Sequence, residues 1–252
     1  MSLLLNCDLG ESSLSQSIKL NERVMPFIDQ ANVACGYHAG DPIVMRSTLI
    51  AAKSYDVSVG AHPSYPDPDG FGRRPMKLPT DELMAVLHYQ IGALLGIAKG
   101  IGTVVKYVKP HGALYNDMME KDEARKGVMR AVAEMRQPLA LMLQATSKAD
   151  KHLEEANNFG IEVIFEAFAD RCYDARGALV PRTKEGALHG REKMLHQVEK
   201  IIRFGSVTTE SGLELPLHAD SLCVHGDNDI GVEALQEIRL LIDREHDESG
   251  QL

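Results

Sequence analysis

The sequence predicts a single α/β domain built as a seven-stranded parallel β/α barrel, TIM-like, with strands inside and helices outside. Three observations lead to this fold class. Short apolar runs alternate with helical patterns from one end of the 252 residues to the other. No linker or change of composition divides the chain, so we expect one domain over residues 1–252. Reactive side chains recur just after the apolar runs, where β/α-barrel enzymes carry their active sites.

The predicted strands are short apolar runs bounded by turn residues, which is typical of strands buried on both faces of a parallel sheet. In chain order they are residues 3–5 (ending at 7–8), 32–35, 57–61, 104–108, 139–143, 162–165 and 221–224.

Helical patterns lie between the strands, over residues 43–55, 80–99, 122–136, 147–159, 192–204 and 230–244. Asp41 and Pro42 supply an N-cap and a proline at the first helical position for the first of these helices. Gly100, Gly160 and Gly205 favour the ends of three others. A small β-hairpin is expected just before the last strand, with arms at 207–209 and 213–215.

Composition excludes several classes of protein. With 27 Lys and Arg against 36 Asp and Glu, the net charge is -9, which argues against nucleic acid as a partner. No apolar stretch approaches the roughly 18 to 20 residues of a membrane span, so no membrane association is expected. The 4 cysteines lie far apart without a C-x-x-C pair, which predicts reduced thiols in a cytoplasmic protein.

Polar and titratable side chains gather after every predicted strand except the fifth. They are Asn6, Asp8 and Glu11, then His38, then His62, then Lys109 and His111, then Glu166, Asp170 and Arg171, and finally His225 and Asp227. In a parallel barrel the carboxyl ends of all strands open on one face. Residues two apart on a strand also share a side, so pairs such as Asn6 and Asp8 point together. We therefore expect these groups to meet in one cavity.

Two interpretations of the Asp and His residues stay open. Imidazole and carboxylate groups suit zinc, iron or nickel. Asp8, His38, His62, His111 and His225 could bind a divalent metal, and the first three are the expected ligands. No pair has the i, i+4 spacing of a helical zinc motif. Alternatively, the groups carry protons and contact anions without metal, and any single one is also explained as a hydrogen-bonded core histidine.

The loop after the third strand contains Gly70-Phe71-Gly72-Arg73-Arg74. This pattern can offer backbone amides and guanidinium groups to a carboxylate or phosphate, although exposed arginines on a loop are also common. The sequence has no P-loop, no G-x-G-x-x-G fingerprint and no G-x-S-x-G nucleophile elbow.

Seven segments together resemble the LamB/YcsF family, in order along essentially the whole chain. They are NCDLGE (6–11), ANVACGYHAGDP (31–42), GAHP (60–63), GFGRR (70–74), VKPHGALYN (108–116), FADR (168–171) and CVHGD (223–227). The resemblance implies a seven-stranded barrel of the glycoside hydrolase/deacetylase type. It also implies the activity of the A subunit of prokaryotic 5-oxoprolinase, which cleaves 5-oxo-L-proline to L-glutamate with hydrolysis of ATP, in company with B and C subunits. Residues 12–30 form a shorter segment than is usual in the family.

With that reaction implied, catalytic roles are assigned to Asp8, His62, His111 and Asp170. Binding of substrate or phosphate is assigned to Asn6, Glu11, His38, Arg73, Arg74, Lys109, Arg171, His225 and Asp227. Asp8 is the base or water-orienting group, and His111 delivers a proton to the ring nitrogen. ATP is the cosubstrate, and a divalent metal is the further candidate cofactor.

Two other functions fit the same residues. One is a metal-dependent amidohydrolase or deacetylase that needs neither ATP nor partners. The other is a non-catalytic subunit that positions its partners, which the missing nucleotide motifs keep open. Against the second, a scaffold does not require seven polar motifs at one rim.

Overall fold

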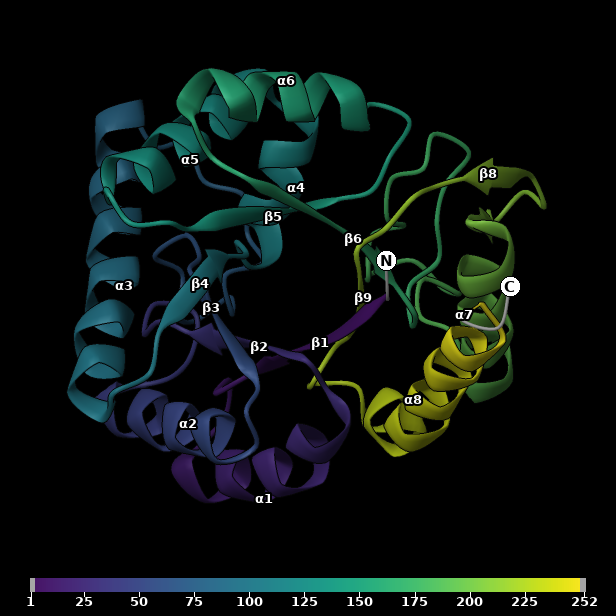
Figure 1. The fold of residues 1–252 in the computed structure, drawn as a ribbon. Coiled ribbons are helices and arrows are strands. Elements are labelled where there is room, and N and C mark those ends of the chain that lie inside the picture. Colours follow the sequence, from purple (N-terminus) through teal and green to yellow (C-terminus); the bar gives the residue numbers. More distant parts are fainter. Residues whose placement is uncertain (1–2, 250–252) are drawn as a thin grey trace.

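Seven parallel strands form a closed barrel in the order β1-β2-β3-β4-β5-β6-β9 (Figure 1). The computed structural model describes residues 3–249, and residues 1–2 and 250–252 of the expected domain lie outside the described residues. The strands are β1 (Leu4–Leu9), β2 (Gln30–Ala34), β3 (Ser58–His62), β4 (Val105–Val108), β5 (Ala140–Gln144), β6 (Val163–Phe168) and β9 (Ser221–Val224). The predicted seven-stranded barrel is confirmed.

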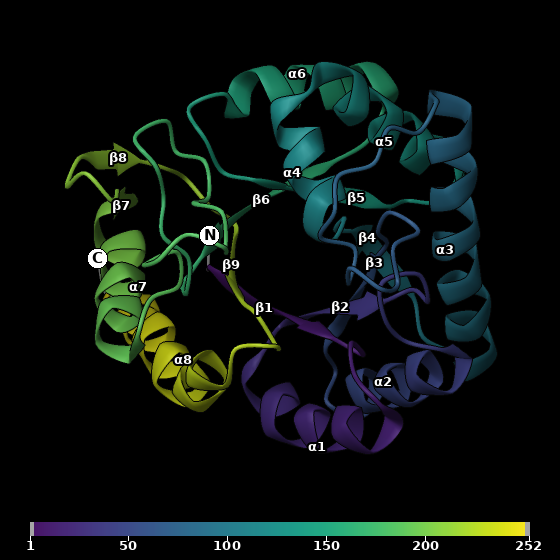
Figure 2. The ribbon, with the colours of Figure 1, turned by 180° about the vertical axis from the view of Figure 1, so that it is seen from behind.

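Helices surround this barrel (Figures 1 and 2). They are α1 (Leu14–Val24), α2 (Pro42–Ser54), α3 (Thr80–Ile101), α4 (Gly112–Glu120), α5 (Asp122–Glu134), α6 (Ala149–Phe159), α7 (Arg191–Phe204) and α8 (Asp229–Ser249), with a 3-10 turn η1 (Met25–Phe27) after α1. Each helix predicted from the sequence is present, and the predictions missed α1 and α4.

The two missed helices lack a clear apolar stripe next to a cap. α1 buries Ser17 and Asn21 beside a single valine, so its inward face does not look apolar in the sequence. α4 begins directly after His111, inside a segment that the sequence presents as a polar motif. Its first residue is Gly112, a poor helix former.

Local sequence signals predicted the start of one helix correctly and the end of another incorrectly. The carboxylate Oδ1 of Asp41 accepts hydrogen bonds from the backbone N–H groups of Ile43 and Val44, both at 2.8 Å, so the predicted N-cap is confirmed. α3, by contrast, does not end at Gly100. It continues to Ile101 and is closed by Gly102 in the left-handed conformation, with φ of 73°.

The predicted hairpin is present between α7 and β9. Its arms, β7 (Ser206–Thr208) and β8 (Glu214–Pro216), pair antiparallel as a separate two-stranded sheet outside the barrel (Figure 1).

Alternate residues of the strands divide between two cores. In β5, Leu141 and Leu143 belong to the large core between barrel and helices, whereas Met142 packs in a separate cluster with Tyr107 and Ile164. The period of two along a strand explains this division, because odd and even side chains point to opposite faces of the sheet. The smaller cluster therefore fills the inside of the barrel.

Replacing Gly60 with alanine tests how tightly this interior is packed. A Cβ at Gly60 would lie 2.1 Å from Cε2 of the buried Tyr107 ring, so we expect the free energy of unfolding to fall by about 1–3 kcal/mol. The matched control is Gly92→Ala in α3, where the added Cβ would meet nothing within 4 Å apart from its chain neighbours and the backbone of its own helix. That change should stabilise the protein by at most about 1 kcal/mol. Urea unfolding measures both, and equal stability of the two variants would contradict the packing argument.

One helix corrects an expectation about membranes. α3 has 22 residues and is apolar enough to cross a bilayer by length and composition, although the sequence predicted no such stretch. Leu87, Ile91 and Leu94 on this helix are completely buried. The helix packs against β3, β4 and α5, so one of its faces lies in the core of the protein.

Candidate active site

A cavity of about 390 Å³ lies at the carboxyl ends of the strands. It brings together Asp8, His62, His111 and His225, from four different strand ends, as the parallel barrel predicts. The charged and imidazole side chains among its lining residues are Asp8, His62, Arg73, Lys109, His111, Glu120, Arg171, Arg182 and His225.

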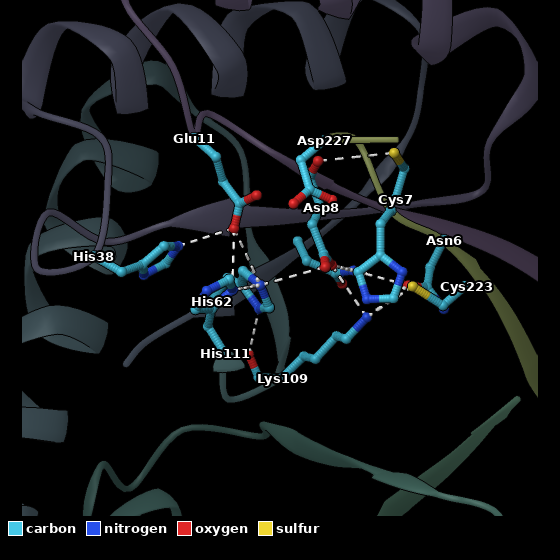
Figure 3. Close-up of polar contacts among 12 residues, drawn as sticks. Asn6, Cys7, Asp8, Glu11, His38, His62, Lys109, His111, Cys223 and Asp227 are labelled. Atoms are coloured by element: carbon cyan, nitrogen blue, oxygen red, sulfur yellow. Dashed lines mark hydrogen bonds and ion pairs between the residues drawn. The ribbon is translucent and has the colours of Figure 1, made fainter. Parts of the chain in front are cut away.

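Lys109 is the centre of a buried polar cluster on the floor of this cavity. Its ammonium Nζ lies 3.1 Å from Oδ1 of Asp8 and donates to Oδ1 of Asn6 at 3.2 Å (Figure 3). It also lies 2.9 Å from Oε2 of Glu166. Burial alone lowers the pKa of Lys109, but Asp8 and the other acidic groups around it raise the pKa well above its usual value. The lysine is therefore charged at neutral pH.

The pKa values of the two carboxyls beside this lysine shift in opposite directions. Burial opposes ionisation of both groups. For Asp8, Lys109 and His62 outweigh burial and hold the pKa well below its usual value. For Glu166, burial outweighs Lys109 and raises the pKa. Asp8 is thus the ionised carboxylate that faces the cavity.

Asn32 fixes the position of Asp8. Its side-chain Nδ2 donates to Oδ1 of Asp8 at 2.7 Å and to Oδ1 of Asn6 at 2.8 Å. Its own oxygen accepts from the hydroxyl of Tyr107 at 2.7 Å. Sequence reasoning missed Asn32 as a site residue, although the strand alternation that singled out Asn6 and Asp8 applies equally to a polar residue inside β2.

A second cluster consists of Glu11 with three histidines (Figure 3). Oε1 of Glu11 lies 2.9 Å from Nε2 of His38, 3.1 Å from Nδ1 of His111 and 3.5 Å from Nε2 of His62. The metal ligands expected from the sequence, Asp8, His38 and His62, do not form one group. Glu11 and His111 join His38 and His62 instead, and Asp8 groups with Cys223 and His225.

The hydrogen bonds to backbone carbonyls assign the protons in this cluster. Nδ1 of His62 donates to the carbonyl oxygen of Lys109 at 2.6 Å, and Nε2 of His111 donates to the carbonyl oxygen of Phe71 at 3.0 Å. Burial lowers the pKa of His62 to about 3, so this ring is neutral and its Nε2 carries a lone pair.

His225 is oriented by a buried carboxylate. Its Nδ1 donates to Oδ1 of Asp170 at 2.9 Å, and Asn228 donates to the other carboxylate oxygen at 2.9 Å. Burial acts to raise the pKa of Asp170, but His225 and Asn228 outweigh it and lower the pKa to about 2. The ring stacks on Phe168 and lines the cavity. Because Nδ1 is bound to Asp170, Nε2 is the nitrogen free to meet a ligand.

Three arginines border the cavity. Arg73 and Arg182 both pair with Asp227, Arg182 at 3.0 Å. Arg171 is buried, and burial together with the nearby Arg182 lowers its pKa to about 10. Sequence reasoning missed Arg182, because the loop that joins β6 to α7 carries no motif at that point.

Arg74 does not belong with them. Its guanidinium pairs with Asp67, with Nε at 2.8 Å from Oδ1, and it is not among the cavity-lining residues. The backbone amides of Gly70 and Gly72 also donate to Asp67, at 3.1 and 2.8 Å. These contacts stabilise the loop itself. Of the residues in the expected anion site at 70–74, Arg73 is the one that lines the cavity.

Five other expected binding or catalytic residues do not line the cavity themselves. They are Asn6, Glu11, His38, Asp170 and Asp227, and each contacts a residue that does line it.

The sequence matches the LamB/YcsF family over residues 3–251. The A subunit of 5-oxoprolinase from Vibrio campbellii is 47% identical over 238 residues, with 94% of each chain covered. That of Pseudomonas fluorescens is 50% identical, covering 94% of this chain and 95% of its own. The crystal structure of the lactam utilization protein from Thermus thermophilus is 34% identical, covers 97% of both chains and has a TM-score of 0.85. A putative cellobiose-phosphate cleavage protein from Enterococcus faecalis, 13% identical with a TM-score of 0.56, shares the fold alone.

Proposed function

The chain belongs to the LamB/YcsF family, and we propose that it is the A subunit of an ATP-dependent 5-oxoprolinase acting with B and C subunits. Its relatives named as 5-oxoprolinase A subunits, 47% and 50% identical, support this role. The observation that carries the proposal is the cavity in which an ionised Asp8, a charged Lys109 and an Asp170-oriented His225 face three arginines.

The cavity suits a small anionic lactam. The arginines on one side supply positive charge and hydrogen-bond donors for the carboxylate of 5-oxo-L-proline, because guanidinium groups bind carboxylates in a planar, two-point fashion. Arg171 is the buried member, and Arg73 and Arg182 complete the side nearer solvent. The lactam ring then extends toward Asp8 and His225.

The proposed reaction opens the ring in balanced steps. The lactam oxygen attacks the γ-phosphorus of ATP and releases ADP, which makes the ring carbon more electrophilic. Water adds to that carbon, the C–N bond breaks, and the nitrogen takes up a proton. A second water releases phosphate from the acyl phosphate that results, leaving L-glutamate. Asp8 orients the attacking water through Oδ2, because Oδ1 is occupied by Asn32 and Lys109.

We assign proton delivery to His225 in place of His111. Both ring nitrogens of His111 are already engaged, Nε2 with the carbonyl of Phe71 and Nδ1 with His62 and Glu11. His225 has only Nδ1 engaged, and the carboxylate of Asp170 holds that ring in a fixed orientation. Asp170 is therefore a positioning residue for His225.

A metal-dependent amidohydrolase is the second candidate, because one observation favours it. The cluster of Glu11 with three histidines places four potential metal ligands next to Asp8, and two of them line the cavity. In such an enzyme the ion would activate water without ATP.

Reconstitution separates the candidates. We expect glutamate release from 5-oxo-L-proline only when the purified chain, the B and C subunits and ATP are all present. Release by the chain alone without ATP, abolished by a chelator, would instead establish the amidohydrolase. Release that requires the chain but is unaffected by Asp8→Asn and by His225→Gln would indicate that the chain only positions its partners and has no chemistry of its own.

A further inference from the structure

We propose that Glu11, His38, His62 and His111 bind one divalent transition-metal ion of the zinc type at the edge of the cavity. The four donor atoms lie within 4.8 Å of one another. Oε1 of Glu11 lies 2.9, 3.1 and 3.5 Å from the nearest nitrogens of His38, His111 and His62. A tetrahedral zinc site with bonds of about 2.0–2.1 Å requires donor separations of about 3.3 Å. The three separations from Glu11, and the 2.9 Å between Nδ1 of His111 and Nε2 of His62, are close to that edge length.

The proton assignments place two lone pairs opposite each other. The hydrogen bonds to the carbonyls of Lys109 and Phe71 put protons on Nδ1 of His62 and Nε2 of His111. The remaining nitrogens, Nε2 of His62 and Nδ1 of His111, face each other at 2.9 Å, and each would carry a lone pair if both rings were neutral. Two lone pairs at that distance repel unless a proton or a metal ion lies between them. Histidine ligands of metals have this arrangement, in which one ring nitrogen binds a carbonyl and the other binds the ion.

Ring stacking and charge favour a metal ion over extra protons. The rings of His38 and His111 stack in parallel with centroids 3.8 Å apart, so positive charge on both rings is unfavourable. Glu11 is nevertheless buried deeply enough to need a positive partner, with 10% of its side chain exposed. One divalent ion supplies that charge and leaves all three rings neutral.

Asp8 lies outside this group of ligands and belongs to a second group with Cys223 and His225. Its Oδ1 accepts from Asn32 and from the ammonium of Lys109, and that positive charge next to Asp8 repels a second cation. The donor set of three imidazoles and one carboxylate selects Zn²⁺, Co²⁺, Fe²⁺ or Ni²⁺ over Mg²⁺ and Ca²⁺, which prefer oxygen ligands. The site exists whether or not the reaction uses ATP, so its test does not depend on the proposed function.

The experiment titrates the isolated full chain, stripped with a chelator, with Co²⁺. We expect about one ion per chain, with the visible d–d absorption of a tetrahedral site, and displacement of Co²⁺ by Zn²⁺. Elemental analysis of protein purified without a metal-affinity tag should find the native ion. Glu11→Gln and His38→Ala should each weaken Co²⁺ binding by more than about 100-fold. Loss of a residue that only hydrogen-bonds to a metal ligand typically lowers metal affinity by about 10- to 100-fold, and loss of a ligand itself should lower it further.

Two control variants make the ligand set specific. Asp8→Asn should retain Co²⁺ binding, and so should His88→Ala, which removes a histidine bound to the carbonyl of Ala131 outside the cluster. His62→Ala is the alternative ligand variant if Glu11→Gln or His38→Ala loses its helical circular dichroism. The proposal is overturned if the wild-type chain binds no Co²⁺, or if folded ligand variants bind it as tightly as the wild type.

Discussion

Replacing Asp8 with asparagine is expected to slow glutamate release by the assembled enzyme by about 10²- to 10⁴-fold. Asparagine keeps the size of the side chain and an oxygen for Asn32 to bind, so the barrel should remain folded. It removes the negative charge at Oδ2, which lies 3.5 Å from Nε2 of His62 and faces the cavity. The attacking water then loses the group that orients it. The measurement is kcat of glutamate release with saturating ATP and 5-oxo-L-proline.

Asp29→Asn is the matched control at the other end of the barrel. Asp29 directly precedes β2, and its carboxylate accepts from the backbone N–H of Leu5 and from Arg239. The same chemical change there should leave kcat within about two-fold, since the residue lies far from the strand ends that form the cavity. Wild-type turnover by a folded Asp8→Asn enzyme would contradict the role given to Asp8.

Replacing Lys109 with methionine is expected to lower the free energy of unfolding by about 3–5 kcal/mol. The lysine is 2% exposed and contacts both Asp8 and Glu166. Without its charge, Asp8 must either remain ionised in a buried environment or take up a proton, and each outcome costs free energy. Denaturant unfolding at neutral pH measures the loss.

Two further variants test the cause of this loss. Lys184→Met removes a lysine from an exposed ion pair with Glu210 and should cost at most about 1 kcal/mol, because solvent screens surface pairs. Adding Glu166→Gln to Lys109→Met removes one of the uncompensated carboxyls and should restore part of the stability. If Lys109→Met lowered the free energy of unfolding no more than Lys184→Met, the buried contacts of Lys109 with Asp8 and Glu166 would not stabilise the fold.

The parts of the fold that were predicted are those with strong local signals. The seven strands are apolar runs with turn residues beside them, and α2 has the Asp41 cap followed by Pro42. α1 was missed because its buried positions include Ser17 and Asn21, which take part in no apolar stripe. α3 ends beyond Gly100, because either glycine is acceptable locally as a C-cap, and it is Gly102 that adopts the left-handed conformation.

The sequence predicted which residues lie together in the site better than it predicted which of their side chains contact each other. Strand ends and alternation along each strand placed Asp8, His62, His111 and His225 together, because a parallel barrel brings all its carboxyl ends to one face. Alternation does not specify which side chains touch. The structure pairs His62 and His111 with Glu11, and it pairs Asp8 with Lys109.

Periodicity and residue type were enough to predict a parallel barrel with acids, bases and arginines at one rim. The folded chain was needed to see that Arg74 binds Asp67 while Arg182, from the long loop after β6, reaches the cavity. It was also needed to see that the pKa of Asp8 is lowered while that of Glu166 is raised, and which imidazole nitrogens donate to backbone carbonyls. Those outcomes depend on burial and on short distances between residues far apart in the chain. Asn6 and Glu166, for example, are 160 positions apart and lie 3.3 Å from each other, and no local pattern contains that information.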